Sequence, residues 1–406
     1  TLFRSSISVI TQEDLQKKPY VNLLDAVKDI EGVDIGETND KTNNGTVSIR
    51  GMGSDYTLIL IDGKKQNNSD IYPNGFEGAQ LASIPPLSMI ERIEVIRGSM
   101  STLYGSDAMG GVINIITKKI SKEWTGAIGY AKTFQTDNAY GNNDKTDVSI
   151  MGPLIKDKLG LSLRGSFYDQ AKSNPEYGKV YDLNGVDRSK SNDSFGGGKG
   201  NVQNENWTFG TGLTFTPSEN HTIKADFDVA KQKFDNKAHL TKNGTTVYPL
   251  GTVDSLNTIW SNQRAGYADT FRMEREQYSL AWEADWAVGK STVGVHHIES
   301  SNIGRSMPLT ASDRKFVDDM KTKYPGTLAN FNLNATQIEK DRFNGLMPRD
   351  ARTLESTNTT YSAKYELPLN SHYIVVGTEL QETGLKDGVY GMDKGLTNRK
   401  KEFYQY

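Results

Sequence analysis

The feature of this sequence that most restricts its fold is the strict alternation of apolar and smaller or polar residues beyond Trp124. In the stretch 207–215, every second side chain would lie on one face of an extended strand, with Gly and Thr between them. The residues on that face are Trp207, Phe209, Thr211, Leu213 and Phe215. The same period of two recurs at Ile223, Ala225, Phe227 and Val229 and at Tyr278, Leu280, Trp282, Ala284 and Trp286. The sequence therefore predicts a series of half-apolar β-strands.

The connections between these strands alternate in length. Four are tight, at 152–158, 216–221, 287–291 and 368–372. Three are long, polar and rich in Gly or Asn, at 171–205, 234–272 and 301–352. Turns at one end and long loops at the other are typical of an outer-membrane β-barrel, whose strands of about ten residues turn apolar side chains to lipid and polar ones to the lumen. A secreted β-sandwich or solenoid is the alternative, but it would not confine such long loops to one side.

Ten strands are expected in all. They begin near residues 125, 144, 158, 206, 221, 272, 291, 353, 372 and 399. The apolar fraction of 35% agrees with this, because a water-filled or plugged lumen needs no apolar lining. No run of about 18 apolar residues predicts a transmembrane helix. The sequence opens at Thr1 without a basic and apolar signal segment, so we expect a trimmed mature end.

Charge and cysteine content exclude several functions. The chain has 47 basic and 50 acidic residues, which gives no basic surface of the kind that nucleic-acid binding requires. It has no cysteine, which removes disulfides, thiol nucleophiles and Cys-ligated metals. His296 and His297 are adjacent and would point to opposite faces of a strand, so they cannot chelate one metal together. No catalytic motif is present, and we expect neither a catalytic residue, nor a metal site, nor an enzyme.

The first 122 residues have a different, mixed α/β pattern. The segment ISVITQEDL at 7–15 predicts a strand that leads into a helix with Thr11 as N-cap. A helix is predicted over 22–33, where Gly32 ends it, and strands over 46–51 and 56–64. We therefore divide the chain into an α/β domain, 1–122, and a strand domain, 123–406.

The sizes of the two domains restrict how they combine. Ten strands would close a barrel of roughly 10 Å radius, whereas a domain of about 120 residues is a sphere of roughly 18 Å. Twenty-two strands give about 22 Å, which can hold it. We expect a barrel of 22 antiparallel strands with the α/β domain inside, of which about ten strands are present, so that the chain stops mid-barrel at Tyr406. A side-by-side arrangement is the alternative.

A glycine-bearing loop separates two apolar runs in RIEVIRGSMSTLYGSDAMGGVINIITKK, residues 92–119. Glycines there permit a tight apex, where backbone can approach a ligand or a wall without Cβ clashes. The loop lacks the Gly-Lys-Ser/Thr ending of a phosphate loop.

This loop, together with SISVITQEDL and VSIRGMGSDYTLILIDGK, resembles the plug domain of TonB-dependent outer-membrane receptors, most of all the colicin I receptor and the catecholate (enterobactin-type) siderophore receptors. The similarity covers 7–119. It implies a 22-stranded barrel with an N-terminal plug, in the outer membrane of a Gram-negative bacterium, that imports a scarce metal chelate with energy from TonB.

The resemblance also implies partners. TonB would bind a segment before Thr1, lipid and lipopolysaccharide would surround a monomeric barrel, and bacteriocins or phage could dock on its long loops. Iron would arrive only within the siderophore, so no cofactor is expected.

Arg50 and Arg97 each precede a glycine at the end of a predicted strand. The resemblance implies that they form, with Glu94, a buried latch between plug and barrel, the arginines meeting glutamates of the barrel wall. A buried guanidinium requires a paired carboxylate. The alternative is an ordinary ion pair within the domain, with Glu91 or Glu94.

Ligand contacts are implied for two plug loops, 65–80 and 99–106. The candidates are Gln66, Asn67, Tyr72, Asn74, Phe76, Thr102, Leu103 and Tyr104. Tyr72, Phe76 and Tyr104 offer flat faces for an aromatic chelate, although Tyr104 could instead pack within its loop.

Ferric catecholates are anionic, so cations are expected among the contacts. The first plug loop departs from the enterobactin-type pattern, because it has Asp70 and Glu77 and no arginine. The cationic candidates are then the barrel-loop residues Arg264, Arg305, Arg314 and Arg349, each of which could also be a solvated loop charge.

Three functions stay open at this point. The first is import of a ferric siderophore, of catecholate type. The second is reception of cobalamin or another scarce nutrient, for which a neutral ligand would not need cationic loops. The third is a passive plugged porin, an adhesin or a surface enzyme.

Overall fold

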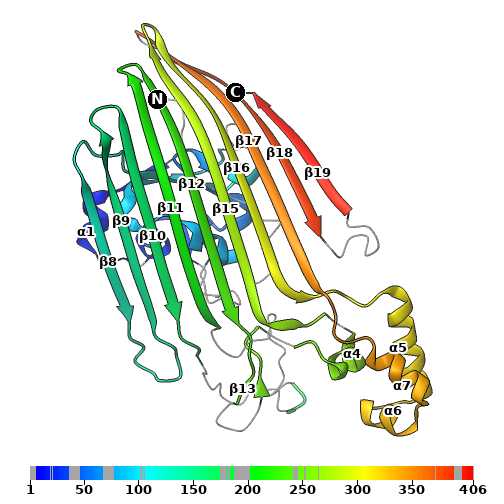
Figure 1. Cartoon of the computed structure of the whole chain (residues 1–406). Coiled ribbons are helices and arrows are strands. Elements are labelled where there is room, and N and C mark those ends of the chain that lie inside the picture. Colours follow the sequence, from blue (N-terminus) through cyan, green and yellow to red (C-terminus); the bar gives the residue numbers. More distant parts are fainter. Residues whose placement is uncertain are drawn as a thin grey trace.

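Two β-sheets dominate the structure, a computed structural model of the 406-residue chain. Residues 6–18, 20, 22–35, 46–66, 77–100, 104, 106–173, 181, 183–186, 202–240, 246–250, 253–263, 265–370, 372–387 and 396–405 are described. A five-stranded sheet has the order β1-β6-β7-β4-β5, and a ten-stranded sheet runs from β19 to β8. The smaller sheet and its helices, which we call the inner unit, lie behind the larger sheet, which we call the wall (Figure 1).

The inner unit combines short strands with short helices. Its strands are β1 (Ser6–Thr11), β2 (Val33–Ile35), β3 (Val47–Ile49), β4 (Thr57–Ile61), β5 (Lys64–Lys65), β6 (Ile90–Arg97) and β7 (Gly111–Thr117). Its helices are α1 (Gln12–Lys17) and α2 (Leu23–Val27), with 3₁₀ turns η1 (Ser54–Tyr56), η3 (Glu77–Ser83), η4 (Leu87–Met89) and η5 (Ser106–Ala108). Its core is aliphatic, and all five residues of β4 are buried.

The sequence pattern located these elements well, with one difference in length. The cap at Thr11 is confirmed, because its hydroxyl accepts the Asp14 amide in a capping box. The helix predicted over 22–33 ends at Val27. Beyond Val27 the backbone makes turns with i−3 hydrogen bonds, from the Ile30 amide to the Val27 carbonyl and from the Val33 amide to the Ile30 carbonyl. The helical spacing of apolar residues therefore extends past the end of the α-helix.

The wall is an antiparallel meander. Its strands are β8 (Thr125–Thr133), β9 (Asn143–Ile155), β10 (Leu159–Gln170), β11 (Gln203–Ser218), β12 (His221–Asp235), β15 (Tyr267–Trp286), β16 (Gly289–Ser306), β17 (Ala351–Leu369), β18 (His372–Asp387) and β19 (Leu396–Gln405). All ten predicted strands are confirmed. A small hairpin of β13 (His239–Leu240) and β14 (Thr246–Val247) interrupts the meander between β12 and β15. Within the described residues β8 and β19 are edges of an open sheet.

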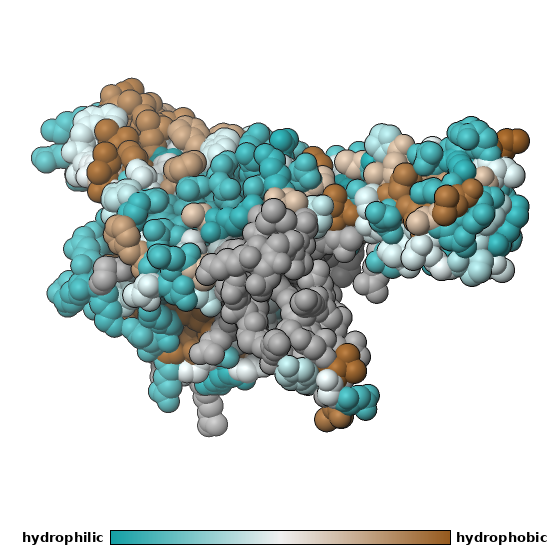
Figure 2. All heavy atoms as spheres, turned by 90° about the horizontal axis from the view of Figure 1, so that it is seen from below, coloured by the Kyte–Doolittle hydropathy of each residue, from teal (hydrophilic) through white to brown (hydrophobic). Residues whose placement is uncertain are grey.

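The two faces of the wall have opposite character, as the alternation predicted. Large apolar side chains on the outer face are exposed, among them Ile128, Phe167, Trp207, Phe209, Leu213, Phe215, Tyr278 and Leu280. Polar side chains on the inner face are buried, among them Ser149, Ser162, Asn206, Gln232, Arg275 and His296. Apolar atoms gather on the outer face of the sheet when it is viewed from the end with the long connections (Figure 2). This face fits a lipid environment.

Two of the long connections fold into a helical lobe that stands apart from the wall (Figures 1 and 2). It contains α4 (Leu256–Asn262), α5 (Ala311–Lys323), α6 (Leu328–Asn334) and α7 (Gln337–Asn344). The helices share a buried core that includes Trp260, Phe316, Phe331 and Phe343. The sequence pattern predicted loops here, so these helices were not anticipated. No helix in the part of the chain that is described is long and apolar enough to cross a membrane.

Candidate functional site

The inner unit meets the wall at the hairpin that follows β4. Asp62 and Gly63 both have left-handed backbones, with φ of 50° and 76°, which makes a tight two-residue turn within the stretch 56–64 that was predicted as strand. The Asp62 carboxylate accepts the Thr117 amide at 2.8 Å and the Thr117 hydroxyl at 2.7 Å. The turn is thereby fixed to β7, and it aims the residues after it at the wall.

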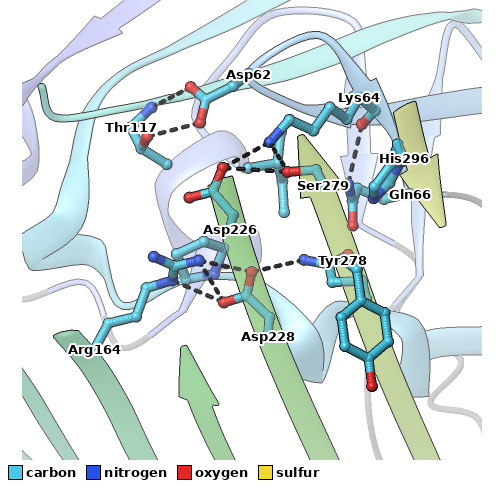
Figure 3. A pocket seen from close by; sticks show the side chains of 13 residues that line it. Asp62, Lys64, Gln66, Thr117, Arg164, Asp226, Asp228, Tyr278, Ser279 and His296 are labelled. Atoms are coloured by element: carbon cyan, nitrogen blue, oxygen red, sulfur yellow. Dashed lines mark hydrogen bonds and ion pairs between the residues drawn. The ribbon is translucent and has the colours of Figure 1, made fainter. Parts of the chain in front are cut away.

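Both lysines of β5 bind the wall. Lys64 Nζ donates to Asp226 Oδ2 at 3.0 Å and to Ser279 Oγ at 2.7 Å (Figure 3). Lys65 Nζ donates to Glu379 Oε1 at 2.6 Å, and the two side chains are only 10% and 15% exposed. Because adjacent residues of a strand point to opposite sides, the two lysines reach different strands, β12 and β18.

Gln66, the next residue, is held by a wall arginine. Arg275 Nη1 donates to the Gln66 main-chain oxygen at 3.0 Å, and Nη2 donates to Gln66 Oε1 at 2.7 Å. Both residues are buried. Gln66 was expected to contact ligand; in this structure its side-chain amide donates to the Lys64 carbonyl and its side-chain oxygen accepts from Arg275.

A further ion pair lies within the wall beneath this hairpin. Arg164 and Asp228 form a two-bond pair, with Nε to Oδ1 at 2.8 Å and Nη2 to Oδ2 at 2.6 Å. Gln277 adds a bond to Asp228 Oδ2 at 3.0 Å. The pair crosses strand β11 at Gly210, where any side chain would collide with both partners. Glycine at this position makes room for the pair.

A polar cavity of about 30 Å³ separates the hairpin from the wall. Its lining includes Asp62, Lys64, Gln66, Arg164, Asp226, Asp228, Ser279 and His296 (Figure 3). This volume has room for a few water molecules, and the polar lining supplies their partners. His296 lies on the inner face, whereas His297 faces outward and contacts Thr359 and Glu299, so the expectation that they diverge is confirmed. No cluster of three metal ligands occurs among the described residues.

A second group of contacts joins the η3–η4 segment to the wall. Gln232 Nε2 donates to the Ala79 carbonyl at 2.8 Å, and Asn206 Nδ2 donates to the Ala82 carbonyl at 3.2 Å. The hydroxyls of Ser88 and Ser149 are 3.2 Å apart. The described interface therefore contains ion pairs, amides, hydroxyls and carbonyls, together with an apolar cluster in which Ala79 of the plug side joins Phe234, Phe271 and Met273 of the wall.

Arg97 does not meet a wall carboxylate in the described residues. Its Nη2 donates to Ser6 Oγ at 2.5 Å and to Ser8 Oγ at 3.0 Å, and its Nη1 donates to the Glu31 carbonyl. The register of β1 with β6 places Ser6 directly opposite Arg97, which brings hydroxyls rather than carboxylates to the guanidinium. Arg97 thus fastens β1 within the inner unit.

The other residues expected in the latch also stay within the inner unit. Arg50 is exposed and not buried as expected, with φ of 55°. Glu94 accepts from Arg92 Nε at 2.8 Å and from Asn114 at 3.2 Å, and Glu91 also pairs with Arg92. Glu91 and Glu94, the partners that the alternative of an ordinary ion pair named, are therefore bound by Arg92, a residue that was not among the candidates.

Tyr104 packs within its loop. It lies partly buried against a cluster of Leu58, Leu60, Met100, Ala108 and Val112. Burial raises the pKa of its hydroxyl. The structure thus supports the packing alternative for Tyr104 and not an outward aromatic surface.

The cationic candidates have three different surroundings. Arg305 stacks over the Tyr267 ring with 4.9 Å to the ring centroid, and Arg314 is exposed on α5. Arg349 is buried in an ion pair with Asp254, the two side chains being 5% and 10% exposed. Arg349 is therefore a structural residue at the base of the helical lobe. The remaining candidates, Asn67, Tyr72, Asn74, Phe76, Thr102, Leu103 and Arg264, lie outside the described residues.

Replacing Arg349 by Met is expected to loosen the helical lobe, because it leaves Asp254 buried without its partner, at a cost of about 3–5 kcal/mol. The double variant Arg349→Met, Asp254→Leu should recover most of the loss. The rate of protease cleavage within 253–350 in rising urea measures both. Equal resistance of Arg349→Met and the parent would show that the pair does not hold the lobe.

The contacts that the sequence pattern did not reveal are Lys64, Lys65, Arg164, Asp226, Asp228, Arg275 and Glu379. A signal for some of them was present. Asp226 and Asp228 flank Phe227 on the polar face of a predicted strand, and a carboxylate on a lumen-facing position needs a partner.

Comparison with known proteins agrees with this geometry. Residues 3–112 match the family described as TonB-dependent Receptor Plug Domain. The chain belongs to the TonB-dependent receptors. Its fold is accordingly an outer-membrane β-barrel with the inner unit as plug and the ten-stranded sheet as barrel wall.

Relatives extend the similarity into the barrel. The chain is 33% identical to the iron-regulated outer membrane virulence protein of Vibrio cholerae over 307 residues. This alignment covers 75% of this chain and 41% of the relative. It is 27% identical over 403 residues to the ferrienterobactin receptor of Escherichia coli, in an alignment that covers 94% of this chain and 47% of that receptor. The crystal structure of the siderophore receptor PirA from Acinetobacter baumannii superimposes with a TM-score of 0.65 at 27% identity, covering 94% of this chain and 48% of that one.

The chain spans about half the length of the curated relatives it matches. Its location is the outer membrane of a Gram-negative bacterium, in keeping with the names of these relatives. The family is one of transport receptors.

Proposed function

We propose that the chain is part of a TonB-dependent active transporter that imports a ferric siderophore of catecholate type. Residues 1–122 serve as the plug and residues 123–406 as the N-terminal part of the barrel. The plug closes the lumen and binds TonB through a segment ahead of Thr1. The observation that carries the proposal is the character of the interface, where Lys64, Lys65 and Gln66 hold the plug to the wall through polar contacts around a small cavity.

A polar interface suits a plug that must move. Each hydrogen bond in water contributes a net of about 0.5–1.5 kcal/mol, because water replaces a partner that leaves. An apolar interface would resist displacement by about 25 cal/mol for each Å² that is uncovered. Water in the cavity can solvate the lysines and carboxylates as the plug is pulled, which lowers the resistance to a mechanical load.

The ligand class rests on the relatives and on charge. A relative is named as a ferrienterobactin receptor and a structural neighbour as a siderophore receptor. For contact with an anionic ferric catecholate we propose Asn67, Tyr72, Asn74, Phe76, Thr102 and Leu103 of the plug and Arg264, Arg305 and Arg314 of the barrel loops. Gln66, Tyr104 and Arg349 do not belong to this set, because their side chains are engaged elsewhere.

A titration panel tests the proposal in the full-length protein. Quenching of tryptophan fluorescence is measured with ferric catecholates, ferric hydroxamates, cobalamin and haem. We expect saturable quenching by a ferric catecholate at submicromolar concentration and uptake of the radioactive iron complex only in cells that contain TonB. If cobalamin quenches the fluorescence and no ferric siderophore does, the protein is a receptor for another nutrient. If uptake does not require TonB, the protein is a passive channel.

A further inference from the structure

Gln66 and Ala79, which flank the segment 67–78 in the sequence, are both fastened to the wall. Gln66, at its start, is held by Arg275 of β15, and the carbonyl of Ala79, at its end, is held by Gln232 of β12. The two wall side chains are neighbours. Gln232 pairs with Met273 in the register of β12 and β15, so Arg275 is only two residues along the same inner face. One patch of the wall therefore holds both Gln66 and Ala79.

The positive charge of Arg275 is buried beside neutral hydrogen-bond acceptors. The guanidinium is 5% exposed, and the acceptors of its Nη atoms are all neutral, namely Gln66 O, Gln66 Oε1 and Gln277 Oε1. Its Nε is buried and makes no hydrogen bond within the protein. Gln232 has the complementary deficit, because its amide donates to Ala79 while its Oε1 is buried and accepts nothing. A buried donor and a buried acceptor without partners each destabilise the folded state.

A cavity of about 10 Å³ lies beside both residues. Gln232, Arg275, Ser83, Ser300, Ser301 and Met273 are among those that line it. This is the size at which one water molecule begins to fit, and a polar lining with an open donor and an open acceptor is what retains buried water.

We infer that Arg275 and Gln232, joined by one buried water between Arg275 Nε and Gln232 Oε1, form a brace that holds Gln66 and Ala79 against the wall. This inference rests on the proposed function for its consequence, since four of the proposed ligand contacts lie between Gln66 and Ala79 in the sequence. Fixing both ends of a segment reduces the conformational freedom that it loses on binding, so the brace improves affinity by preorganisation. Arg275 and Gln232 are positioning residues that touch the plug and not the ligand.

The wall offers a matched control. Asn206 makes the same kind of bond, from a side-chain amide to the carbonyl of Ala82, but three residues beyond Ala79. Asn206→Leu removes one wall contact of the same chemistry and leaves the brace intact. Arg275→Met and Gln232→Leu remove one arm of the brace each, and Arg275→Lys retains the charge without the two-atom grip on Gln66.

Two measurements on the full-length protein test the inference. The first, hydrogen exchange of amides between residues 60 and 79, needs no ligand, and we expect it to be faster in Arg275→Met and Gln232→Leu and unchanged in Asn206→Leu. The second is ferric catecholate affinity, which we expect to fall about tenfold in either brace variant while the maximal uptake rate at saturation stays near that of the parent. Because both arms act on one segment, the double variant should lose less than the product of the single losses. Arg275→Lys should recover only part of the affinity.

The outcomes separate the brace from the function. Equal exchange in all variants, or equal acceleration in Asn206→Leu, overturns the brace. Failure of the parent to bind any ferric siderophore overturns the proposed function and leaves the exchange result to decide on the brace. A crystal structure of the parent should show a water between the two side chains, absent in Gln232→Leu, and an empty cavity there overturns the bridging water.

Discussion

Oxidising the double variant Ser88→Cys, Ser149→Cys is expected to abolish import by the full-length receptor, while ligand binding continues. Ser88 belongs to the plug and Ser149 to strand β9 of the wall, and their hydroxyl oxygens are 3.2 Å apart. A disulfide between these positions would tie the plug to the barrel by a covalent bond that TonB cannot break. The expected effect is a complete loss of import, because the disulfide turns a weak polar contact into a permanent one.

The geometry favours formation of this disulfide. A disulfide needs Cβ atoms about 3.5–4.5 Å apart, and two serines whose oxygens approach within hydrogen-bonding distance are close to that range. Sulfur reaches farther than oxygen, so little movement is required. The 406 residues contain no cysteine, which leaves no competing thiol in this chain.

Reversibility provides the control. Reduction should restore import to the level of the unoxidised variant, and neither single variant should respond to the oxidant. Siderophore affinity, measured by fluorescence quenching, should be the same in both redox states. Undiminished import by the oxidised double variant would show that the plug need not separate from β9 during transport, and movement would then have to be confined to the part of the plug that precedes η4.

The strands of the wall could be predicted from the sequence more fully than the contacts between wall and plug. Strands depend on local sequence patterns, whereas these contacts depend on residues far apart in the chain. Alternation along a strand is local, and ten strands could be located from it, together with the side on which the connections are long. The Lys65–Glu379 pair joins residues 314 positions apart. It depends on the stagger of several strands and on how the plug is oriented behind them, and neither leaves a mark in the local pattern.

The arginines of the plug show how strand register selects the partners of a guanidinium. The family resemblance implied that Arg50 and Arg97 would bind wall glutamates. In the structure, Arg97 donates to the hydroxyls of Ser6 and Ser8, which the pairing of β1 with β6 brings opposite to it. The lysines of β5 contact the wall instead, since the Asp62–Gly63 turn directs them there. A guanidinium bonds to whichever acceptors the strand register supplies.

The helical lobe was missed for a related reason. Its helices are short, and most of their stability comes from packing against one another rather than from their own sequences. Trp260 comes from a different connection than Phe331 and Phe343, yet the three rings lie within 5.1–5.7 Å of one another. Two connections with the composition of polar loops therefore fold only when the wall brings them together.

Breaking the Lys65–Glu379 pair is expected to loosen the closed state of the receptor. Both side chains are largely buried, so Lys65→Met leaves a carboxylate without its cation, and the loss of such a partner costs about 3–5 kcal/mol. Glu379→Lys should have a larger effect, because it places two ammonium groups at the contact. We expect both variants to admit large antibiotics that the parent excludes and to show frequent channel openings in planar bilayers.

The exchanged pair Lys65→Glu, Glu379→Lys separates this electrostatic role from packing. If attraction between the two charges holds the plug at β18, the exchange should restore most of the barrier, since the same two charges then meet in reversed order. If the methylene groups of Lys65 matter more, Lys65→Met should remain closed, and the exchanged pair should leak as much as Glu379→Lys. A variant that is closed to antibiotics but imports faster than the parent is the most informative result. It would show that this ion pair limits the rate at which TonB displaces the plug, which is the expectation for a contact that must be strong enough to close the lumen and weak enough to yield.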